Sequence, residues 1–318
     1  MPATYAYLGP EGTFTEVALR TLPETATREL LPMLSVPAAL DAVRAGEAEA
    51  AFVPIENSVE GGITTTLDEL VSGEPLMIYR EVLLSITFAL LVRPGTRLED
   101  VKTVTAHPAA QAQVRNWMKA HLPDALWESA ASNADGARLV QEGRYDAAFA
   151  GEFAAARYGL VPLETNIHDA DNAQTRFVLV GRPARPAAPT GADKTSVVIW
   201  QRDDHPGGLR DLLGEFAVRG VNLMLLQSRP TGEGIGNYCF AIDAEGHISE
   251  RRVAESLMGL KRSCLKVRYL GSYPRADVTD VTDVTADALR RPLSGTTDAE
   301  FVAAAEWVAR CQDGRFPN

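Results

Sequence analysis

The chain has few cysteines and no long apolar run, and these absences exclude several classes of protein. Its three cysteines, Cys239, Cys264 and Cys311, are odd in number and lack C-x-x-C spacing, so they predict neither a disulfide framework nor a zinc site. No apolar run approaches the roughly 18 residues that a membrane-spanning helix needs. The N-terminus has no basic segment followed by an apolar one, so no secretory signal is predicted. We therefore expect a protein of the reducing cytoplasm.

Positive charge is also scarce. The 31 lysines and arginines are outnumbered by 42 aspartates and glutamates, which gives a formal net charge of −11. A field of that sign repels nucleic acids and anionic lipids, and no stripe of basic residues with interleaved aromatics offsets it. The sequence therefore predicts neither a nucleic-acid partner nor a membrane partner. An anionic small molecule would need local binding groups, such as helix N-termini or single arginines.

Several catalytic motifs are missing as well. The chain has no G-x-S-x-G nucleophile elbow and no GxxxxGK[ST] phosphate loop, and its segment GPEGTFT lacks the spacing of a dinucleotide-binding turn. Its five histidines are scattered and form no cluster that would suit a metal ion. The sequence therefore predicts chemistry without a cofactor or a metal, in which hydrogen-bond donors act on a small anion.

Two breaks in composition divide the chain. Residues 181–194 combine prolines with small residues, which suits an extended linker, and residues 275–295 repeat Asp-Val-Thr three times in a row. The last segment is expected to form a helix, because Thr297-x-x-Glu300 fits a capping box and apolar residues follow at helical spacing. We predict a first domain over residues 1–182, a linker over 183–193, a second domain over 194–274, and an acidic tail with a terminal helix over 275–318.

The first domain alternates short apolar runs with helical patterns, which is typical of an α/β domain with a largely parallel sheet. Residues 42–56 and 139–153 align without gaps, and each predicts a helix, a glycine turn and a buried strand. One explanation is that such units look alike in many proteins. The other is a domain with a ligand cleft between two similar lobes, lobe I at about 1–80 plus 163–182 and lobe II at about 81–162.

The second domain has a different order of predicted strands and helices. Residues 194–274 predict a strand, an amphipathic helix, two strands separated by a glycine-rich turn, a second helix and a last strand. The order β-α-β-β-α-β is that of a ferredoxin-like domain.

Four turns of the first domain are rich in hydroxyl and amide side chains, and two of them also contain glycine. Glycines let backbone N–H groups approach a ligand, and a helix N-terminus presents unpaired donors, so such turns suit a small anion rich in oxygen. Ordinary helix caps are the default explanation of such polar residues, His107 also suits a loop histidine without a role, and Arg176 suits an edge charge. The residues concerned are Gly9, Gly12, Thr13 and Thr15; Asn57, Ser58, Gly61, Gly62 and Thr64; Thr105, His107 and Gln113; and Asn172, Thr175 and Arg176.

These turns also carry a resemblance. GPEGTFTEVA (9–18), PIENSVEGG (54–62), His107-Pro108 with Gln113, GEFAAARYGL (151–160) and TRF (175–177) resemble the prephenate dehydratase family. HPGGL (205–209), QSRP (227–230) and GNYCF (236–240) resemble the regulatory ACT domain of that family. The resemblance covers about residues 4–274. It implies an α/β fold, in which a two-lobed, periplasmic-binding-protein-like catalytic domain precedes a ferredoxin-like ACT domain.

The resemblance implies a lyase that converts prephenate to phenylpyruvate, carbon dioxide and water in phenylalanine biosynthesis. It implies that Thr175 is the essential hydroxyl at the leaving oxygen, with Arg176 and Asn57 as further catalytic residues. Because a threonine hydroxyl is a poor proton reservoir, we interpret Thr175 as a hydrogen-bond donor or a relay. Phe14 and Phe177 are candidate apolar walls for the ring, or plain core residues. The expected substrate-binding residues are Thr13, Phe14, Ser58, Gly62, Gln113 and Phe177.

The resemblance also implies allosteric binding of L-phenylalanine at an interface between ACT domains, in a homodimer or homotetramer. The expected binding residues are Gly207, Gly208, Leu209, Ser228, Arg229 and Pro230. Three residues depart from the family pattern. Ala106 and Ala130 replace a serine and a threonine of the catalytic domain, and Gln227 replaces a glutamate of the ACT domain.

Alternative functions stay open on the sequence. An arogenate dehydratase or a non-aromatising prephenate decarboxylase would share the fold, although the retained TRF segment favours dehydration. A non-catalytic amino-acid sensor would also use two lobes and an ACT domain, and the hydroxyls lost at Ala106 and Ala130 favour it. The intact TRF and ENSVEGG segments oppose it.

Overall fold

A computed structural model describes residues 3–59, 61–170, 173–203, 205–231, 238–277 and 295–315. Asn172, the glycine-rich turn of the second domain and the Asp-Val-Thr repeats beyond residue 277 lie outside the described residues. The chain divides into two compact units, Met1–Glu69 with Val82–Arg182, and Leu70–Glu81 with Pro183–Asn318. The short segment Leu70–Glu81 therefore belongs with the second unit, although the sequence places it inside the first domain.

The first sheet has the strand order β2-β1-β3-β11-β5, with the short β4 paired to β3. Its central strands are apolar over most of their length because both faces are covered, and Tyr5, Tyr7, Phe52 and Phe177 form its core with residues of α1. The elements of this lobe are β1 (Thr4–Leu8), α1 (Phe14–Arg20), β2 (Glu29–Met33), α2 (Val36–Ala45), β3 (Ala50–Asn57), β4 (Gly61–Gly62), α3 (Thr64–Ser72), β5 (Met77–Ser85) and β11 (Gln174–Gly181).

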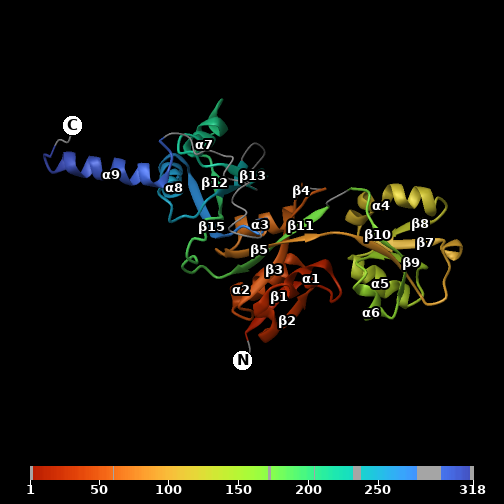
Figure 1. The fold of residues 1–318 in the computed structure, drawn as a ribbon. Coiled ribbons are helices and arrows are strands. Elements are labelled where there is room, and N and C mark those ends of the chain that lie inside the picture. The colour runs from red at the N-terminus through yellow and green to blue at the C-terminus, as the bar shows by residue number, and fades with distance from the viewer. Residues whose placement is uncertain are drawn as a thin grey trace. The chain divides into compact units, whose positions relative to one another are not determined.

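The second sheet has the order β10-β6-β9-β7-β8, and Figure 1 shows its strands gathered with α4–α6. β10 pairs with β6, so the second lobe continues to Ile167 rather than ending near residue 162 as the sequence suggested. Its elements are β6 (Phe88–Val92), β7 (Thr103–Ala106), α4 (Pro108–His121), β8 (Leu126–Ser129), α5 (Asn133–Gln141), β9 (Ala147–Ala150), α6 (Ala154–Tyr158) and β10 (Val161–Ile167).

The two lobes share one topology. β1 is parallel to β2 and β3, and β7 is parallel to β8 and β9. Next to β3 in the first lobe lies the antiparallel strand β11, and next to β9 in the second lobe lies the antiparallel strand β6. In both lobes a helix leads through a glycine with positive φ, Gly46 at 79° or Gly143 at 77°, into the third strand. The internal sequence similarity thus corresponds to equivalent units of two similar lobes.

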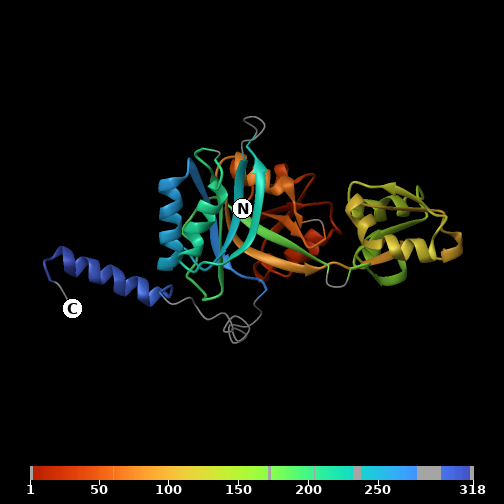
Figure 2. The same cartoon turned by 90° about the horizontal axis from the view of Figure 1, so that it is seen from above.

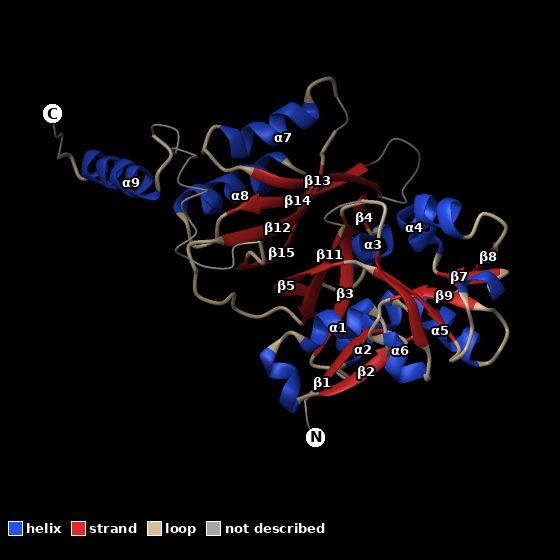
Figure 3. Ribbon diagram, turned by 45° about the vertical axis from the view of Figure 1, so that its right-hand side comes forward, coloured by secondary structure: helices blue, strands red, loops and turns tan. Residues whose placement is uncertain are grey.

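The second unit contains the predicted β-α-β-β-α-β order, and its sheet order β13-β14-β12-β15 confirms the ferredoxin-like topology. Figure 3 shows these four strands side by side, and Figure 2 shows the green and blue helices α7 and α8 on one side of them. The capping box at Thr297 and Glu300 opens α9 as expected. The elements are β12 (Asp193–Trp200), α7 (Gly208–Ala217), β13 (Leu223–Pro230), β14 (Tyr238–Glu245), α8 (Arg251–Ser263), β15 (Lys266–Pro274) and α9 (Asp298–Gln312).

Candidate active site

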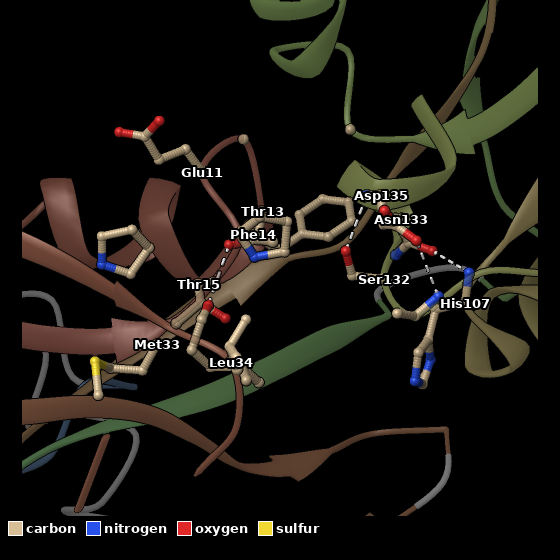
Figure 4. A pocket seen from close by; sticks show the side chains of 17 residues that line it. Glu11, Thr13, Phe14, Thr15, Met33, Leu34, His107, Ser132, Asn133 and Asp135 are labelled. Atoms are coloured by element: carbon tan, nitrogen blue, oxygen red, sulfur yellow. Dashed lines mark hydrogen bonds between the residues drawn. The ribbon is translucent and has the colours of Figure 1, made fainter. Parts of the chain in front are cut away.

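A cavity of about 580 Å³ opens in the first unit. Figure 4 shows that its lining comes from the β1–α1 turn, from the end of β2 at Met33 and Leu34, and from the starts of α4 and α5. Among the described residues that line it, none is a lysine or an arginine. An anion here would therefore depend on hydroxyl, amide, imidazole and backbone N–H donors. The polar lining includes Thr13, Thr15, His107, Ser132, Asn133 and Asp135.

The β1–α1 turn is tightly built. A Cβ on Gly9 would come 2.9 Å from the Pro32 Cβ, so the close approach of the two segments requires glycine. Gly12 has φ of +83° and donates its N–H to Glu16 Oε2 at 2.6 Å. Thr13 accepts the Glu16 N–H at 3.4 Å and so caps α1. The capping role considered for Thr13 is therefore filled, and its side chain still lines the cavity.

Residues of the second lobe hold this turn in place. The Tyr158 hydroxyl donates to the Glu11 carbonyl at 2.8 Å, and Arg157 forms an ion pair with the Glu11 carboxylate. Phe14 packs edge-to-face on Phe88 and on Phe153, with centroid distances of 5.7 and 5.2 Å. Phe14 therefore both lines the cavity and joins the cores of the two lobes.

The starts of α4 and α5 form the facing wall. His107 caps α4, because its Nδ1 accepts the Ala109 N–H at 3.2 Å, and its own backbone N–H donates to Asn133 Oδ1 at 3.0 Å. Ser132 caps α5 by accepting the Asp135 N–H at 2.9 Å. Ser132, Asn133 and Asp135 were missed from the sequence. The Ser-Asn pair before a helical pattern was the available indication, since it repeats the design of the other turns.

The ends of β3 and β11 bring the main catalytic candidates together. Asn57 and Thr175 are direct cross-strand partners, and Asn57 Nδ2 donates to Thr175 Oγ1 at 2.9 Å. Ser58 exchanges two bonds with Gln174, through its backbone N–H and its Oγ, both at 2.9 Å. Gly62 of β4 pairs with Glu56 of β3, so the end of β3 is bordered by β11 on one side and by β4 on the other. Thr175 is only 7% exposed, so its environment is largely dry.

Arg176 lies beside Thr175 but its side chain has a different environment. Successive residues of a strand point to opposite faces, so Thr175 with Asn57 and Arg176 with Glu56 occupy opposite faces of the pair. Arg176 Nη1 lies 3.1 Å from Glu56 Oε2, and Arg176 is 5% exposed. Much of its positive charge is therefore balanced by Glu56 within the protein.

Two other candidates lie in packed surroundings. Phe177 stacks on Phe52 with a centroid distance of 5.5 Å and is 2% exposed, as the core interpretation of this residue requires. Gln113 lies in α4, where its Nε2 donates to the Ala109 carbonyl at 3.1 Å. Its Oε1 is buried and has no partner among the described residues. Neither side chain lines the cavity, and the same holds for Asn57, Ser58, Gly62, Thr175 and Arg176.

The phenylalanine-binding candidates lie at one end of the four-stranded sheet of the second unit. Gly207 has φ of +92° and precedes α7, in the connection that follows β12, and Gly208 and Leu209 open that helix. Ser228, Arg229 and Pro230 end β13. β12 and β13 are both antiparallel to β14, so their C-terminal ends lie at the same end of the sheet, separated by β14. A cavity of about 230 Å³ includes His205 and Gly208 but none of the β13 residues.

Over the part of the chain that the structure describes, no group of three or more His, Cys, Asp or Glu side chains is arranged to hold a metal ion. None of the helices within those same residues is long and apolar enough to cross a membrane.

The architecture defines a class: an enzyme whose two-lobed, periplasmic-binding-protein-like catalytic domain precedes an ACT domain. Residues 5–185 match the family described as prephenate dehydratase, and residues 195–262 match the ACT domain. The chain belongs to the prephenate dehydratase family.

Individual relatives agree along nearly the whole chain. A prephenate dehydratase of Mycobacterium tuberculosis is 46% identical over 318 residues, which cover 98% of this chain and 94% of that protein. One from Mycolicibacterium vanbaalenii is 49% identical and covers 91% of this chain and 97% of that protein. The structure of an Arthrobacter aurescens prephenate dehydratase in complex with L-Phe superposes with a TM-score of 0.89. It is 46% identical and covers 98% of this chain and all of that one.

Proposed function

We propose that this chain catalyses the decarboxylative dehydration of prephenate. The C1 carboxylate leaves as carbon dioxide, and its bonding electrons enter the ring. The C4 hydroxyl takes up one proton and leaves as water, so that phenylpyruvate is formed. Because the ring becomes aromatic, the reaction is strongly driven, and orientation with help at the leaving oxygen is the main task of the enzyme. The observation that carries this proposal is the Asn57–Thr175 hydrogen bond in a chain of this family.

Thr175 is the proposed donor to the leaving C4 oxygen. A hydroxyl has one proton and two lone pairs. Since Asn57 Nδ2 donates to Thr175 Oγ1, that bond uses a lone pair and leaves the threonine proton for the substrate. Asn57 thereby orients the hydroxyl. The proton that completes the water molecule comes from solvent through Thr175 as a relay.

The remaining binding roles are proposed from the residues that line the cavity and from the charge around it. Thr13 and Phe14 line the cavity, and we assign them to a carboxylate and to the ring. Ser58 and Gly62 lie just after Asn57 in the chain, and Gln113 lies in α4. None of the three lines the cavity, and we propose them as secondary binding residues. Glu56 balances the charge of Arg176. We therefore propose that Arg176 sets the electrostatic field around Thr175 and does not bind a substrate carboxylate. A site with little net positive charge favours loss of the charged carboxylate as carbon dioxide.

We further propose that phenylalanine regulates the enzyme through the ACT domain. The Arthrobacter aurescens relative is described in complex with L-Phe, and this chain retains Gly207, Gly208 and Leu209 together with Ser228, Arg229 and Pro230. The first group follows β12 and the second ends β13, so both lie at one end of the sheet with β14 between the two strands. A second copy of the domain would complete a site there, so we propose a homodimer or a homotetramer of a cytoplasmic protein. Gln227, whose Oε1 is buried without a described partner, adds no negative charge to that site.

The test follows phenylpyruvate formation from prephenate for the wild type, Thr175→Ala and Thr175→Ser, each with and without phenylalanine. Turnover that collapses in the alanine variant, recovers in part with serine and responds to phenylalanine supports the proposal. Wild-type rates equal to those in buffer would overturn it. Arogenate, assayed in parallel, decides the amino-substrate alternative. A melting temperature raised by phenylalanine without any turnover would support the sensor instead.

A further inference from the structure

The segment Leu70–Glu81 joins two catalytic elements to the ACT unit. It contains the last turn of α3 and the first half of β5. α3 begins two residues after Gly62, directly downstream of Asn57 and Ser58. The second half of β5 belongs to the catalytic sheet, where β5 is the neighbour of β11, the strand that carries Thr175. One end of the segment therefore continues into the helix that follows the Asn57 turn, and the other end continues into the strand beside Thr175.

The first attachment is at the end of α3. Arg268 of β15 donates through Nη1 to the carbonyl oxygens of Leu70 at 2.9 Å and of Gly73 at 2.8 Å. A helix end has carbonyls without intrahelical partners, and a guanidinium satisfies them while complementing the helix dipole. Arg268 thus fixes the C-terminal end of α3 to the ACT sheet.

The second attachment is a buried ion pair. Lys194 Nζ of β12 lies 3.0 and 3.2 Å from the two carboxylate oxygens of Glu81, and the side chains are 7% and 1% exposed. The Ala276 N–H donates to Glu81 Oε1 at 3.0 Å and satisfies the carboxylate further. A buried ion pair adds little net stability over an apolar pair, but it tolerates only one register, because any slip leaves a charge buried alone.

We infer that Lys194 and Glu81, together with Arg268, are positioning residues that transmit the state of the ACT unit to Thr175. A change of the ACT sheet on effector binding displaces a segment that it holds in a fixed register. The displacement reaches the β11 hydroxyl through β5 and the Asn57 turn through α3. This inference rests on the proposed function, and it adds the route by which phenylalanine acts.

The variants must avoid a buried unpaired charge, since that alone would impair folding. The main variant is therefore the double replacement Lys194→Met with Glu81→Leu, which keeps the volume and removes both charges. Lys194→Arg, which keeps the charge, is the conservative variant for comparison. Ser196→Ala is the matched control. Ser196 lies two residues further along β12, and its buried hydroxyl bonds Asp243 at 2.5 Å and Tyr273 at 2.6 Å within the ACT unit.

Three quantities are measured for each protein: kcat and KM for prephenate, the dependence of turnover on phenylalanine concentration, and amide hydrogen exchange of residues 70–85 with and without phenylalanine. In the wild type and Ser196→Ala, phenylalanine should change both turnover and exchange in that segment. In the double variant we expect phenylalanine still to bind, while its effect on turnover falls by about fivefold or more. Lys194→Arg, which keeps the ion pair with Glu81, should retain the response of the wild type.

Other results overturn the inference. A double variant with the response of the wild type would show that the ion pair does not couple the two units. Equal loss in Ser196→Ala would assign the effect to general weakening of the ACT sheet. Failure of the proposed function is recognised separately, as absence of prephenate turnover in the wild type. Even then, phenylalanine that fails to bind, or that binds without changing exchange in residues 70–85, overturns the coupling itself.

Discussion

The side chains of Asn57 and Thr175 meet across β3 and β11, with Asn57 Nδ2 2.9 Å from Thr175 Oγ1. The two residues are 118 positions apart in the sequence, and both stand where their strands meet the connecting loops. The amide also accepts the Val59 N–H on its oxygen at 2.8 Å. This second bond fixes which end of the amide faces the threonine, so the hydroxyl is held by an oriented donor.

Replacement of Asn57 tests this orientation. Asn57→Ala should lower kcat on the order of 10²-fold, because the Thr175 hydroxyl loses the donor that directs its proton. Thr175→Ala should lower kcat by at least as much. The double variant should be no slower than Thr175→Ala, since residues that act as one unit give non-additive losses. Initial rates of phenylpyruvate formation give all three values.

The control for this cycle is Thr27→Ala, which removes a hydroxyl from an exposed turn and should leave the rates unchanged. Losses in the Asn57 and Thr175 variants that multiply in the double variant would mean that the two side chains act independently. In that case the 2.9 Å contact would not be the functional link between them.

Tyr158 controls the wall of the cavity rather than the chemistry. Tyr158→Phe removes the bond to the Glu11 carbonyl and loosens the β1–α1 turn. We expect KM for prephenate to rise about fivefold, which corresponds to roughly 1 kcal/mol for one hydrogen bond, with kcat nearly unchanged. Tyr145→Phe, on the same core cluster, should leave both constants unchanged. A fall of kcat at constant KM would argue that Tyr158 acts in the reaction itself.

Much of the fold could be predicted because local patterns and topology agree. The helix–glycine–strand units, the ferredoxin-like order and the Thr297–Glu300 capping box all depend on neighbours in sequence. The partner of β10 depends instead on a pairing with β6, about 70 residues earlier in the chain, which no local pattern specifies. The assignment of Leu70–Glu81 to the ACT unit depends in the same way on contacts with β12 and β15.

The candidate site was predicted in part for a similar reason. Turn composition indicated Thr13, Asn57 and Thr175, and the structure brings Asn57 and Thr175 into direct contact. The alternation of a strand separates Arg176 from Thr175, which motif proximity alone does not express. The stacking of Phe177 on Phe52 depends on the β3–β11 register, and its bulge after Arg176 could not be derived from the sequence.

Asp146 should make the second lobe sensitive to acid. Its Oδ2 accepts from the N–H groups of Lys102 and Thr103 at 3.0 and 2.9 Å, and from the Thr103 hydroxyl at 2.9 Å. Burial raises the pKa of this carboxyl, but these hydrogen bonds and the charge of Arg93 outweigh burial and hold the pKa below its usual 3.8. The folded value is the lower one. The stabilisation is therefore complete above the unfolded value and is lost as the pH falls through the folded value.

Asp146→Asn should consequently unfold at a lower urea concentration at neutral pH. We expect its free energy of unfolding to fall by roughly 1–2 kcal/mol, because the charge-assisted hydrogen bonds are lost. The difference from the wild type should shrink as the pH falls below 3.8. Urea unfolding curves between about pH 3 and pH 7 measure it. Asp124→Asn, an exposed change in the same lobe, is the control and should give no such trend. A difference that stays constant with pH would mean that the Asp146 charge does not contribute.

Two glycines of the ACT unit should respond in opposite directions to the same added methyl group. Gly271 of β15 has φ of +136°, and a Cβ there would come 2.2 Å from the Ile78 carbonyl oxygen, which is backbone and has little room to move. Gly271→Ala should therefore lower the free energy of unfolding on the order of 3 kcal/mol or more, through strain and the collision of β15 with β5.

Gly214 lies within α7 with open space around its Cβ position. Gly214→Ala should stabilise by roughly 0.5–1 kcal/mol, because alanine has less backbone freedom to lose and favours the helix. Urea unfolding of both variants at the same pH makes the comparison. Equal stability of the two would show that the Gly271–Ile78 contact yields without cost, and the fixed register of Leu70–Glu81 would then depend on Lys194 and Arg268 alone.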